Sequence, residues 1–177
     1  MNISLAVKRC SAAVLLALGT ASAWNQPSQA QSTTRYFCGT SDRVPTTMYQ
    51  YDTDPPVPLI RWVYNGFIPS GWTPQKRCED VATRFQRFDR ERALEYITTG
   101  TANNLPVVCA VRNEGDICTS DRVLFTLPPG EDPNEAVQNI MNIAGVYENQ
   151  DPRSLIDGRI YIDVDRLLIR NRQLYNR

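Results

Sequence analysis

The sequence predicts an α+β domain in which two helices pack on one face of a mainly antiparallel sheet, with disulfide bonds tying the elements together. Three observations predict this class. Short β-rich segments stand before and after a clear amphipathic helix, a second helix follows them, and four cysteines lie beyond the N-terminal region. An order of strands, helix, strands, helix is typical of helices packed against one side of an antiparallel sheet.

The first three expected strands are rich in β-branched and aromatic residues, which favour a pleated surface. They are residues 35–38, 46–52 and 58–64. Pro55, Pro56 and Pro58 prevent a continuous ladder between the last two.

The clearest element is a helix that begins near Pro74 in "WTPQKRCEDVATRFQRF". Thr73 is a suitable N-cap, and proline fits the first helical position because its missing N–H would have no partner there. Spacings of three and four make one apolar stripe of Cys78, Val81, Ala82, Phe85 and Phe88. The other side carries Arg77, Asp80, Arg84 and Arg87. We interpret it as a solvated face on which Asp80 reaches Arg84, and a polyanion-binding surface is the alternative.

The chain after this helix contains three more expected strands, at 94–98, 106–111 and 122–127. The polar stretch "ITTGTANN" (97–104) is expected to be a connecting loop, with a binding loop as the alternative. "RNEGD" has the glycine and polar residues of a turn between the last two strands.

A second helix is expected in "EDPNEAVQNIMNIAGV", where Asp132 caps, Pro133 follows and Glu135 can complete a capping box. Its apolar stripe consists of Val137, Ile140, Met141 and Ala144. The single domain is therefore expected over residues 36–146. Residues 147–177 are a C-terminal extension whose pattern predicts an edge strand followed by a terminal helix, or a tail that docks on a partner.

The first 30 residues resemble a secretory signal peptide. Lys8 and Arg9 precede a mostly apolar run that is too short to cross a bilayer, and small residues follow it. We expect cleavage after Ala30, with cleavage after Ala23 as the alternative, and an uncleaved membrane anchor as a further one. The protein is therefore expected to be exported to the periplasm or cell envelope, where peripheral membrane association is compatible with the sequence.

The charge balance argues against a nucleic-acid partner. The chain has 19 basic and 19 acidic residues, so loss of Lys8 and Arg9 leaves a net charge of −2. Nucleic-acid binding depends on clustered basic residues that neutralise phosphates. We therefore expect no nucleic-acid partner.

The four remaining cysteines, Cys38, Cys78, Cys109 and Cys118, predict two disulfides in an oxidising compartment. Cys109 and Cys118 would face one another across, or just inside, a hairpin, which leaves Cys38 to pair with Cys78. On a chain-entropy basis the bridges would contribute roughly 2.7 and 3.9 kcal/mol respectively. Zinc and redox-active thiols are the alternatives. Zinc ligands favour pairs two to four residues apart, whereas eight residues separate the closest cysteines here.

The absence of histidine limits the chemistry of the chain. It removes Ser-His-Asp and Cys-His nucleophile systems and every histidine metal site. Asp52 and Asp54 could contact calcium, but they lack the rest of a calcium-binding loop, so we interpret them as turn residues. We therefore expect no cofactor, no metal site, no catalytic residues and no enzymatic activity.

The aromatic residues suggest a binding role. Trp62, Tyr64 and Trp72 are the residues proposed to contact a partner, because amphipathic rings on a surface stack on sugars or anchor proteins. For Trp62 a place in the core is the favoured interpretation.

Several of these segments together resemble the cyanobacterial circadian oscillating polypeptide family. They are "FCGTSDRVPTT", "PLIRWVYNGF", "GWTPQKRCEDVATRFQ", "LEYITTGTANNLPVVCAV" and "CTSDRVLFTLPPGEDP". The resemblance spans residues 36–146 and implies an exported, envelope- or membrane-associated protein whose abundance follows a daily rhythm. It implies no reaction and no ligand residues.

We therefore expect a non-enzymatic envelope domain that binds a protein or glycan partner. The alternative is a histidine-free hydrolase that acts on cell-wall glycan with paired carboxylates. Two carboxylates converging in one cleft, one of them with its pKa raised by burial, would favour this alternative.

Overall fold

The computed structural model of the chain describes residues 35–63, 71–143 and 153–175. The expected signal peptide and Tyr64 lie outside the described residues, as does the end of the second helix from Ala144.

The first strands form a three-stranded antiparallel sheet in the order β1-β2-β3. Its members are β1 (Tyr36–Ser41), β2 (Val44–Tyr49) and β3 (Val57–Arg61). Asp42 and Arg43 join β1 to β2 with φ values of 48° and 67°, as a tight two-residue hairpin turn requires. All three strands predicted before the first helix are present.

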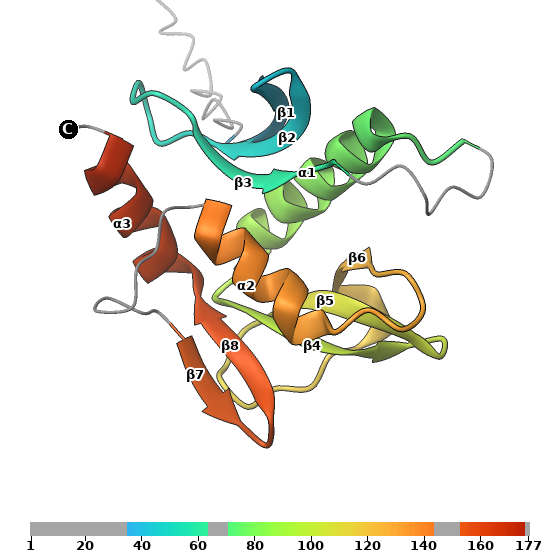
Figure 1. Cartoon of the computed structure of the whole chain (residues 1–177). Helices are drawn as coiled ribbons and strands as arrows, with labels where there is room; N and C mark the ends of the chain where they lie inside the picture. The colour runs from blue at the N-terminus through green and yellow to red at the C-terminus, as the bar shows by residue number, and fades with distance from the viewer. Residues whose placement is uncertain (1–34, 64–70, 144–152, 176–177) are drawn as a thin grey trace, which may run out of the picture. The chain divides into compact units, whose positions relative to one another are not determined.

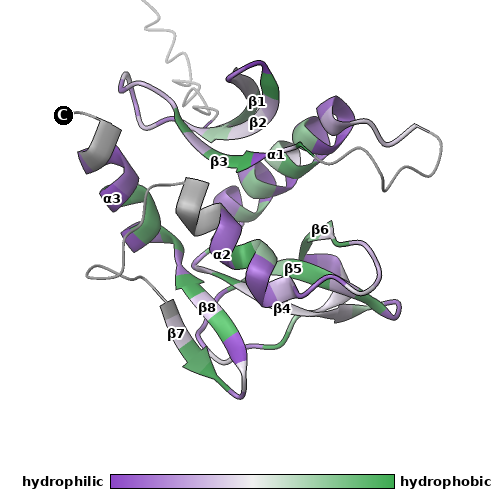
Figure 2. Cartoon of the chain, viewed as in Figure 1, coloured by the Kyte–Doolittle hydropathy of each residue, from purple (hydrophilic) through white to green (hydrophobic). Residues whose placement is uncertain are grey.

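Helix α1 (Pro74–Arg90) has the predicted start and the predicted buried stripe. The Thr73 hydroxyl accepts a hydrogen bond from the Lys76 amide at 3.2 Å, and Pro74 is the first helical residue. Every residue of the predicted apolar stripe is buried. Figure 2 shows α1 and α2 as mixtures of hydrophobic and hydrophilic residues, as expected for helices with one face in the core.

The remaining strands form a five-stranded antiparallel sheet in the order β6-β5-β4-β8-β7. Its members are β4 (Tyr96–Ala102), β5 (Leu105–Val111), β6 (Val123–Thr126), β7 (Arg153–Ile156) and β8 (Arg159–Asp163). A short 3₁₀ turn, η1 (Ser120–Arg122), precedes β6.

The strand expected at 94–98 corresponds to the start of β4, but the prediction of a loop over 97–104 is wrong, because β4 continues to Ala102. Only Asn103 and Asn104 form the turn to β5, with φ values of 51° and 61°. Thr98 and Thr99 are buried within the strand, and the Thr98 hydroxyl donates to the Ile160 carbonyl at 2.9 Å. Threonine is polar in composition but favours strands, and here the neighbouring strand satisfies its hydroxyl.

Helix α2 (Pro133–Ile143) begins at the predicted cap, where the Asp132 carboxylate accepts from the Asn134 amide at 2.8 Å. Helix α3 (Val164–Tyr175) buries Leu167 and Leu168. The predicted strand and terminal helix of the C-terminal segment are thus β8 and α3. β8 lies beside β4 inside the sheet, so it is not an edge strand.

The α+β class and the antiparallel pairing are confirmed, with one difference in detail. The strands divide between two sheets where one was expected. Helix α1 contacts β1, β2 and β6, while α2 contacts β3, β4, β5 and β8, so both helices bridge the two sheets (Figure 1). Strand patterns identify strands but not their partners, which is why the division was not foreseen.

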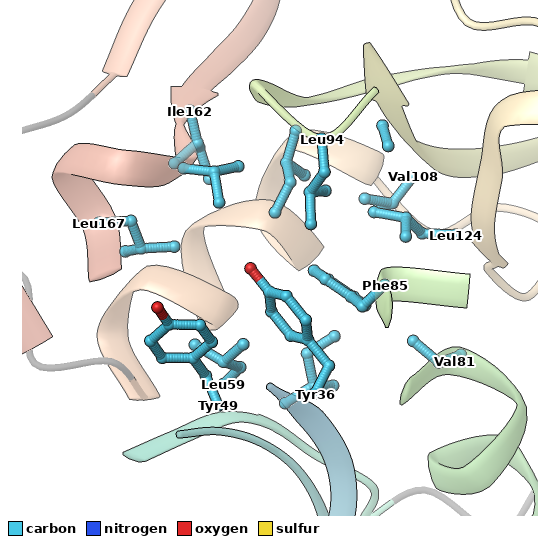
Figure 3. Packing of buried hydrophobic residues seen from close by; sticks show 14 of the residues in the cluster. Tyr36, Tyr49, Leu59, Val81, Phe85, Leu94, Val108, Leu124, Ile162 and Leu167 are labelled. Carbon is cyan, nitrogen blue, oxygen red and sulfur yellow. The ribbon is translucent and has the colours of Figure 1, made fainter. Parts of the chain in front are cut away.

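One hydrophobic core joins the two sheets through these helices. Tyr36 of β1 packs against Phe85 of α1 and Tyr49 of β2, with ring centroids 5.3 and 5.1 Å apart. Figure 3 shows these side chains together with those of the five-stranded sheet, including Val108 and Leu124.

Candidate functional site

The two disulfides have the pairing that the sequence favoured. Cys38 is bonded to Cys78 and Cys109 to Cys118, with Cα atoms 5.4 and 5.7 Å apart. The first bridge ties β1 to the first turns of α1. In the second bridge, Cys109 lies on β5 opposite Val123 of β6. Its disulfide partner Cys118 therefore lies in the loop between these strands and not on the facing strand.

The loop that carries Cys118 folds onto the five-stranded sheet. A Cβ atom built on Gly100 would overlap the Cβ of Cys118 and lie 3.0 Å from its sulfur, so β4 needs glycine at this point. The Tyr161 hydroxyl donates to the Asp116 carbonyl at 3.0 Å and fixes the same loop to β8. Cys109 is fully buried. These contacts describe a packed structural bridge.

Two of the three aromatic residues proposed for binding meet in one pocket. Trp62 is 7% exposed, as its expected core position requires, and its indole N–H donates to the Thr47 hydroxyl at 3.0 Å. Trp72 is 39% exposed. Both line a cavity of about 350 Å³ between α1 and β6, together with Arg77, Asp80, Val81, Arg84, Leu105, Phe125 and Thr126.

Phe125 completes the aromatic wall of this pocket. Its ring is edge-on to that of Trp62, with ring centroids 5.5 Å apart. The guanidinium of Arg77, on α1, lies 5.3 Å from the centroid of the same Trp62 ring. Sequence reasoning missed Phe125 because it belongs to a strand far from Trp62 along the chain. The pocket thus combines an apolar aromatic wall with cationic groups, which is the usual composition of a site that orients a small ligand.

The α1 face interpreted as solvated contributes to the wall of this pocket. The predicted pair between Asp80 and Arg84 does not form. Asp80 pairs with Lys76 at 3.3 Å, and Arg84 Nη1 donates to the Leu124 carbonyl of β6 at 2.9 Å. The spacing of positions 77, 80 and 84 placed them on one helix face, but only the fold shows that β6 lies opposite.

A second cleft, of about 450 Å³, is lined mainly by charged groups. Its residues are Arg35, Gln86, Asp89, Arg90, Arg92, Leu94, Glu95 and Asp165. Burial raises the pKa of Asp89 above its ordinary value; the Arg35 cation opposes this shift and the Asp165 carboxylate adds to it. Nothing in the sequence indicated that Asp89 and Asp165 would meet, because they come from different helices.

Asp52 and Asp54 occupy a turn, in line with their interpretation. The Asp54 amide donates to the Tyr51 carbonyl at 2.9 Å, and the Asp54 carboxylate lies 3.6 Å from Arg172. Within residues 35–63, 71–143 and 153–175, no group of three or more metal-ligating side chains gathers. The helices of the same ranges include none that is long and apolar enough to span a membrane.

The fold and these sites define a small disulfide-bonded α+β domain with an aromatic pocket beside an arginine-bearing helix. The chain belongs to the family described as "Circadian oscillating protein COP23", whose family model matches residues 35–169. The match extends past residue 146 to include β7, β8 and part of α3. No curated protein and no solved structure matches the chain.

Proposed function

We propose that this protein is an exported domain of the cell envelope that binds a glycan or protein partner without catalysing a reaction. The observation that carries the proposal is the pocket walled by Trp62, Trp72 and Phe125. An exposed indole beside buried rings offers a flat apolar face on which a sugar ring or an apolar side chain can rest.

Two features of the sequence and structure that are consistent with one another support export. The N-terminal 30 residues have the charge and hydropathy pattern of a signal peptide, and the domain carries two disulfides, which persist in oxidising compartments. The test is the intact mass of protein purified from the envelope. We expect a chain that starts at Gln31, is four hydrogens lighter than its reduced form, and resists thiol labelling until unfolded. Free thiols in the native protein would contradict the proposal.

Binding at the pocket can be followed by intrinsic fluorescence. The chain has three tryptophans, and Trp24 lies in the expected signal peptide, so both tryptophans of the mature chain line the pocket. Titration with soluble fragments of wall glycan is expected to give a saturable fluorescence change in the mature protein.

The variant Trp72→Ala tests whether this pocket is the binding site. We expect it to lose glycan binding, measured by calorimetry, while keeping its melting temperature, because Trp72 is the exposed ring. Tyr51→Ala is the matched control, since Tyr51 is 45% exposed and lies outside the pocket. Retained affinity in Trp72→Ala would exclude the pocket.

A carboxylate-based hydrolase acting on wall glycan is the second candidate, and the cleft at Asp89 favours it. Asp89 and Asp165 line the same cleft, and burial raises the pKa of Asp89, as a general acid requires. Release of reducing ends from purified wall glycan between pH 4 and 7 tests the activity. If the cleft is catalytic, Asp89→Asn abolishes release while Trp72→Ala only weakens it. No release by the wild-type protein would leave the binding function.

We also propose that the abundance of this protein follows a daily rhythm, as the description of its family suggests. Quantitative immunoblots through two days of constant light would show a period of about one day. A flat time course would contradict the proposal. A rhythm would be a property of expression or turnover and would not change the binding chemistry described above.

A further inference from the structure

The aromatic pocket continues into a second hollow along β6. The second hollow measures about 470 Å³ and shares Arg84, Leu105 and Thr126 with the first, so the two adjoin. We call the joined surface the α1–β6 groove. Its second half is lined further by Arg87, Ala102, Asn103, Val107, Ser120, Asp121 and Val123.

The two halves of the groove differ in chemistry. The first has the rings of Trp62, Trp72 and Phe125, whereas the second has the amide of Asn103 and the hydroxyl of Ser120. Thr126 stands where they meet. A ligand that fits both halves needs flat apolar faces as well as groups that exchange hydrogen bonds, and it must be longer than one sugar ring. An oligosaccharide meets these requirements.

The charges of the groove favour a negatively charged ligand. Helix α1 contributes the cations Arg77, Arg84 and Arg87. The two acidic residues of the lining each lie beside a cation that is not part of it: Asp80 is 3.3 Å from Lys76, and Asp121 is 3.5 Å from Arg122. Because Arg122 is also 3.1 Å from Glu91, the compensation of Asp121 is partial, but the lining still has three cations against two acidic residues.

Arg84 is the cation best placed to recognise a carboxylate. It borders both halves of the groove, and its Nη1 bond to the Leu124 carbonyl holds the side chain in position against β6. That bond uses one of the five N–H donors of a guanidinium, so donors remain for a carboxylate, whose two oxygens match the guanidinium geometry. Arg87 lies further along the groove, and Glu91, 3.9 Å from its Nε, compensates part of its charge.

We propose that the α1–β6 groove binds an acidic polysaccharide, with one sugar ring against Trp72 and the carboxylate of the next unit on Arg84. This inference rests on the proposed binding function and names its ligand class. An acidic peptide would satisfy the arginines, but it would not use the flat aromatic wall next to hydroxyl- and amide-bearing residues as a chain of sugar rings does.

Two probes isolate the carboxylate. β-1,4-linked tetraglucuronate and cellotetraose share one backbone and differ at C6, where the first carries a carboxylate. Calorimetry on the mature, disulfide-bonded protein is expected to show at least about tenfold tighter binding of tetraglucuronate at low salt, as a charge-assisted hydrogen bond implies. The preference should shrink as ionic strength rises, because salt screens exposed charges.

The variant Arg84→Gln tests whether Arg84 causes the preference for tetraglucuronate over cellotetraose. It should weaken tetraglucuronate binding about tenfold more than it weakens cellotetraose binding, so that the preference for the acidic sugar is lost. Arg166→Gln, on α3 and outside the groove lining, is the matched control and should change neither. Near-ultraviolet circular dichroism would confirm that both variants keep the native fold. If Arg84→Gln binds both sugars as the wild type does, the proposal is overturned.

The remaining outcomes separate this inference from the function on which it rests. Equal affinity for the two sugars would overturn the acidic ligand class but retain glycan binding. Tighter binding of an oligoglutamate than of tetraglucuronate would overturn it in favour of an acidic peptide. Binding of neither sugar by folded wild-type protein, together with no response to wall-glycan fragments, would overturn both this inference and glycan binding.

Discussion

The two disulfides hold different kinds of structure. Cys38–Cys78 joins β1 of the three-stranded sheet to α1 across 40 residues of sequence, whereas Cys109–Cys118 closes a loop of nine within the five-stranded sheet. The long bridge thus fixes how a sheet and a helix are placed on one another. The short one fixes a loop on a sheet that already has four ladders of hydrogen bonds.

This difference indicates which part of the fold depends most on stabilisation by a disulfide bond. The three-stranded sheet has two ladders and is short, and small sheets need packing from another element. Helix α1 supplies that packing, and the bridge, the Tyr36–Phe85 ring contact and Gln86 all join it to β1. The same helix lines the groove proposed for ligands through Arg77, Val81 and Arg84. Damage to the β1–α1 contact should therefore also disturb binding.

Removing the bridges one at a time gives the largest expected effect. On the chain-entropy model, Cys38→Ala with Cys78→Ala costs about 3.9 kcal/mol of unfolding free energy, and Cys109→Ala with Cys118→Ala costs about 2.7 kcal/mol. Guanidinium unfolding of the two double variants measures both. Equal costs, or a larger cost for Cys109–Cys118, would contradict the claim that the long bridge stabilises the fold more than the short one.

Gln86 tests the β1–α1 contact without touching a cysteine. Its side-chain oxygen accepts from the backbone amides of Arg35 and Tyr36, at 2.7 and 3.1 Å, and the residue is 6% exposed. Gln86→Met keeps the volume but leaves these donors without their acceptor, so we expect a loss of about 2 kcal/mol. Gln138→Met, at an exposed position of α2, is the control and should lose little. Similar losses in the two variants would show that Gln86 does not hold β1.

A substitution at Gly100 of β4 tests how the loop closed by Cys109–Cys118 packs on this strand. Gly100→Ala places a methyl group where Cys118 packs, so the loop must shift, at a cost of about 2 kcal/mol. In the Cys109→Ala, Cys118→Ala background the loop can move away, and the cost should fall. A double-mutant cycle by chemical denaturation measures this coupling. Additive costs would mean that the loop does not rest on β4.

Helix α1 and strand β4 show how much of the fold the sequence could predict. α1 was predicted in detail because its signals are local: Thr73, Pro74 and the spacing of Cys78, Val81 and Phe85 all lie within a few turns. The cysteine pairing followed from a turn near Cys109. The strand expected at 94–98 matches the start of β4, but its continuation to Ala102 was missed because the threonines are buried only through partners on β5 and β8.

The candidate sites were harder to predict than the fold. The groove depends on Trp72, Arg84 and Phe125, which lie on three segments that only the tertiary structure brings together. Trp72 was selected from composition, and Arg84 was assigned to solvent because β6 could not be placed beside α1. Local patterns predict elements well, but a site built between elements needs the packing that joins them.

Loss of the N-cap of α1, at the helix end that carries the Cys38–Cys78 bridge, should have a smaller effect on stability. Thr73→Ala removes the acceptor of the Lys76 amide and should cost about 1 kcal/mol. Thr83→Ala is a matched control within the helix, where the hydroxyl donates to the Glu79 carbonyl at 2.9 Å and alanine has the higher helix propensity. Thermal unfolding of the pair should show a loss only for the cap. Equal shifts would mean that the cap does not stabilise the bridged end of α1.

The smallest effect concerns the other end of α1, where Asp89 and Arg35 line the same cleft. Burial raises the pKa of Asp89 in the folded protein above the value of about 3.9 expected when unfolded. The folded state therefore holds this proton more tightly. The stability that protonation gives is complete below about pH 3.9 and is lost as pH rises through the raised pKa.

At pH 7 the ionised Asp89 thus costs stability, and Asp89→Asn should raise the melting temperature slightly. The gain is expected to be less than about 0.5 kcal/mol, because the side chain is only half-buried and solvent screens it. The advantage of the variant should disappear near pH 3.5, where the wild-type carboxyl is protonated. Calorimetric melting at both pH values decides this. If Asp89→Asn instead lowers the melting temperature at pH 7 and this loss shrinks toward acid, Asp89 is stabilised by Arg35 more than it is penalised by burial.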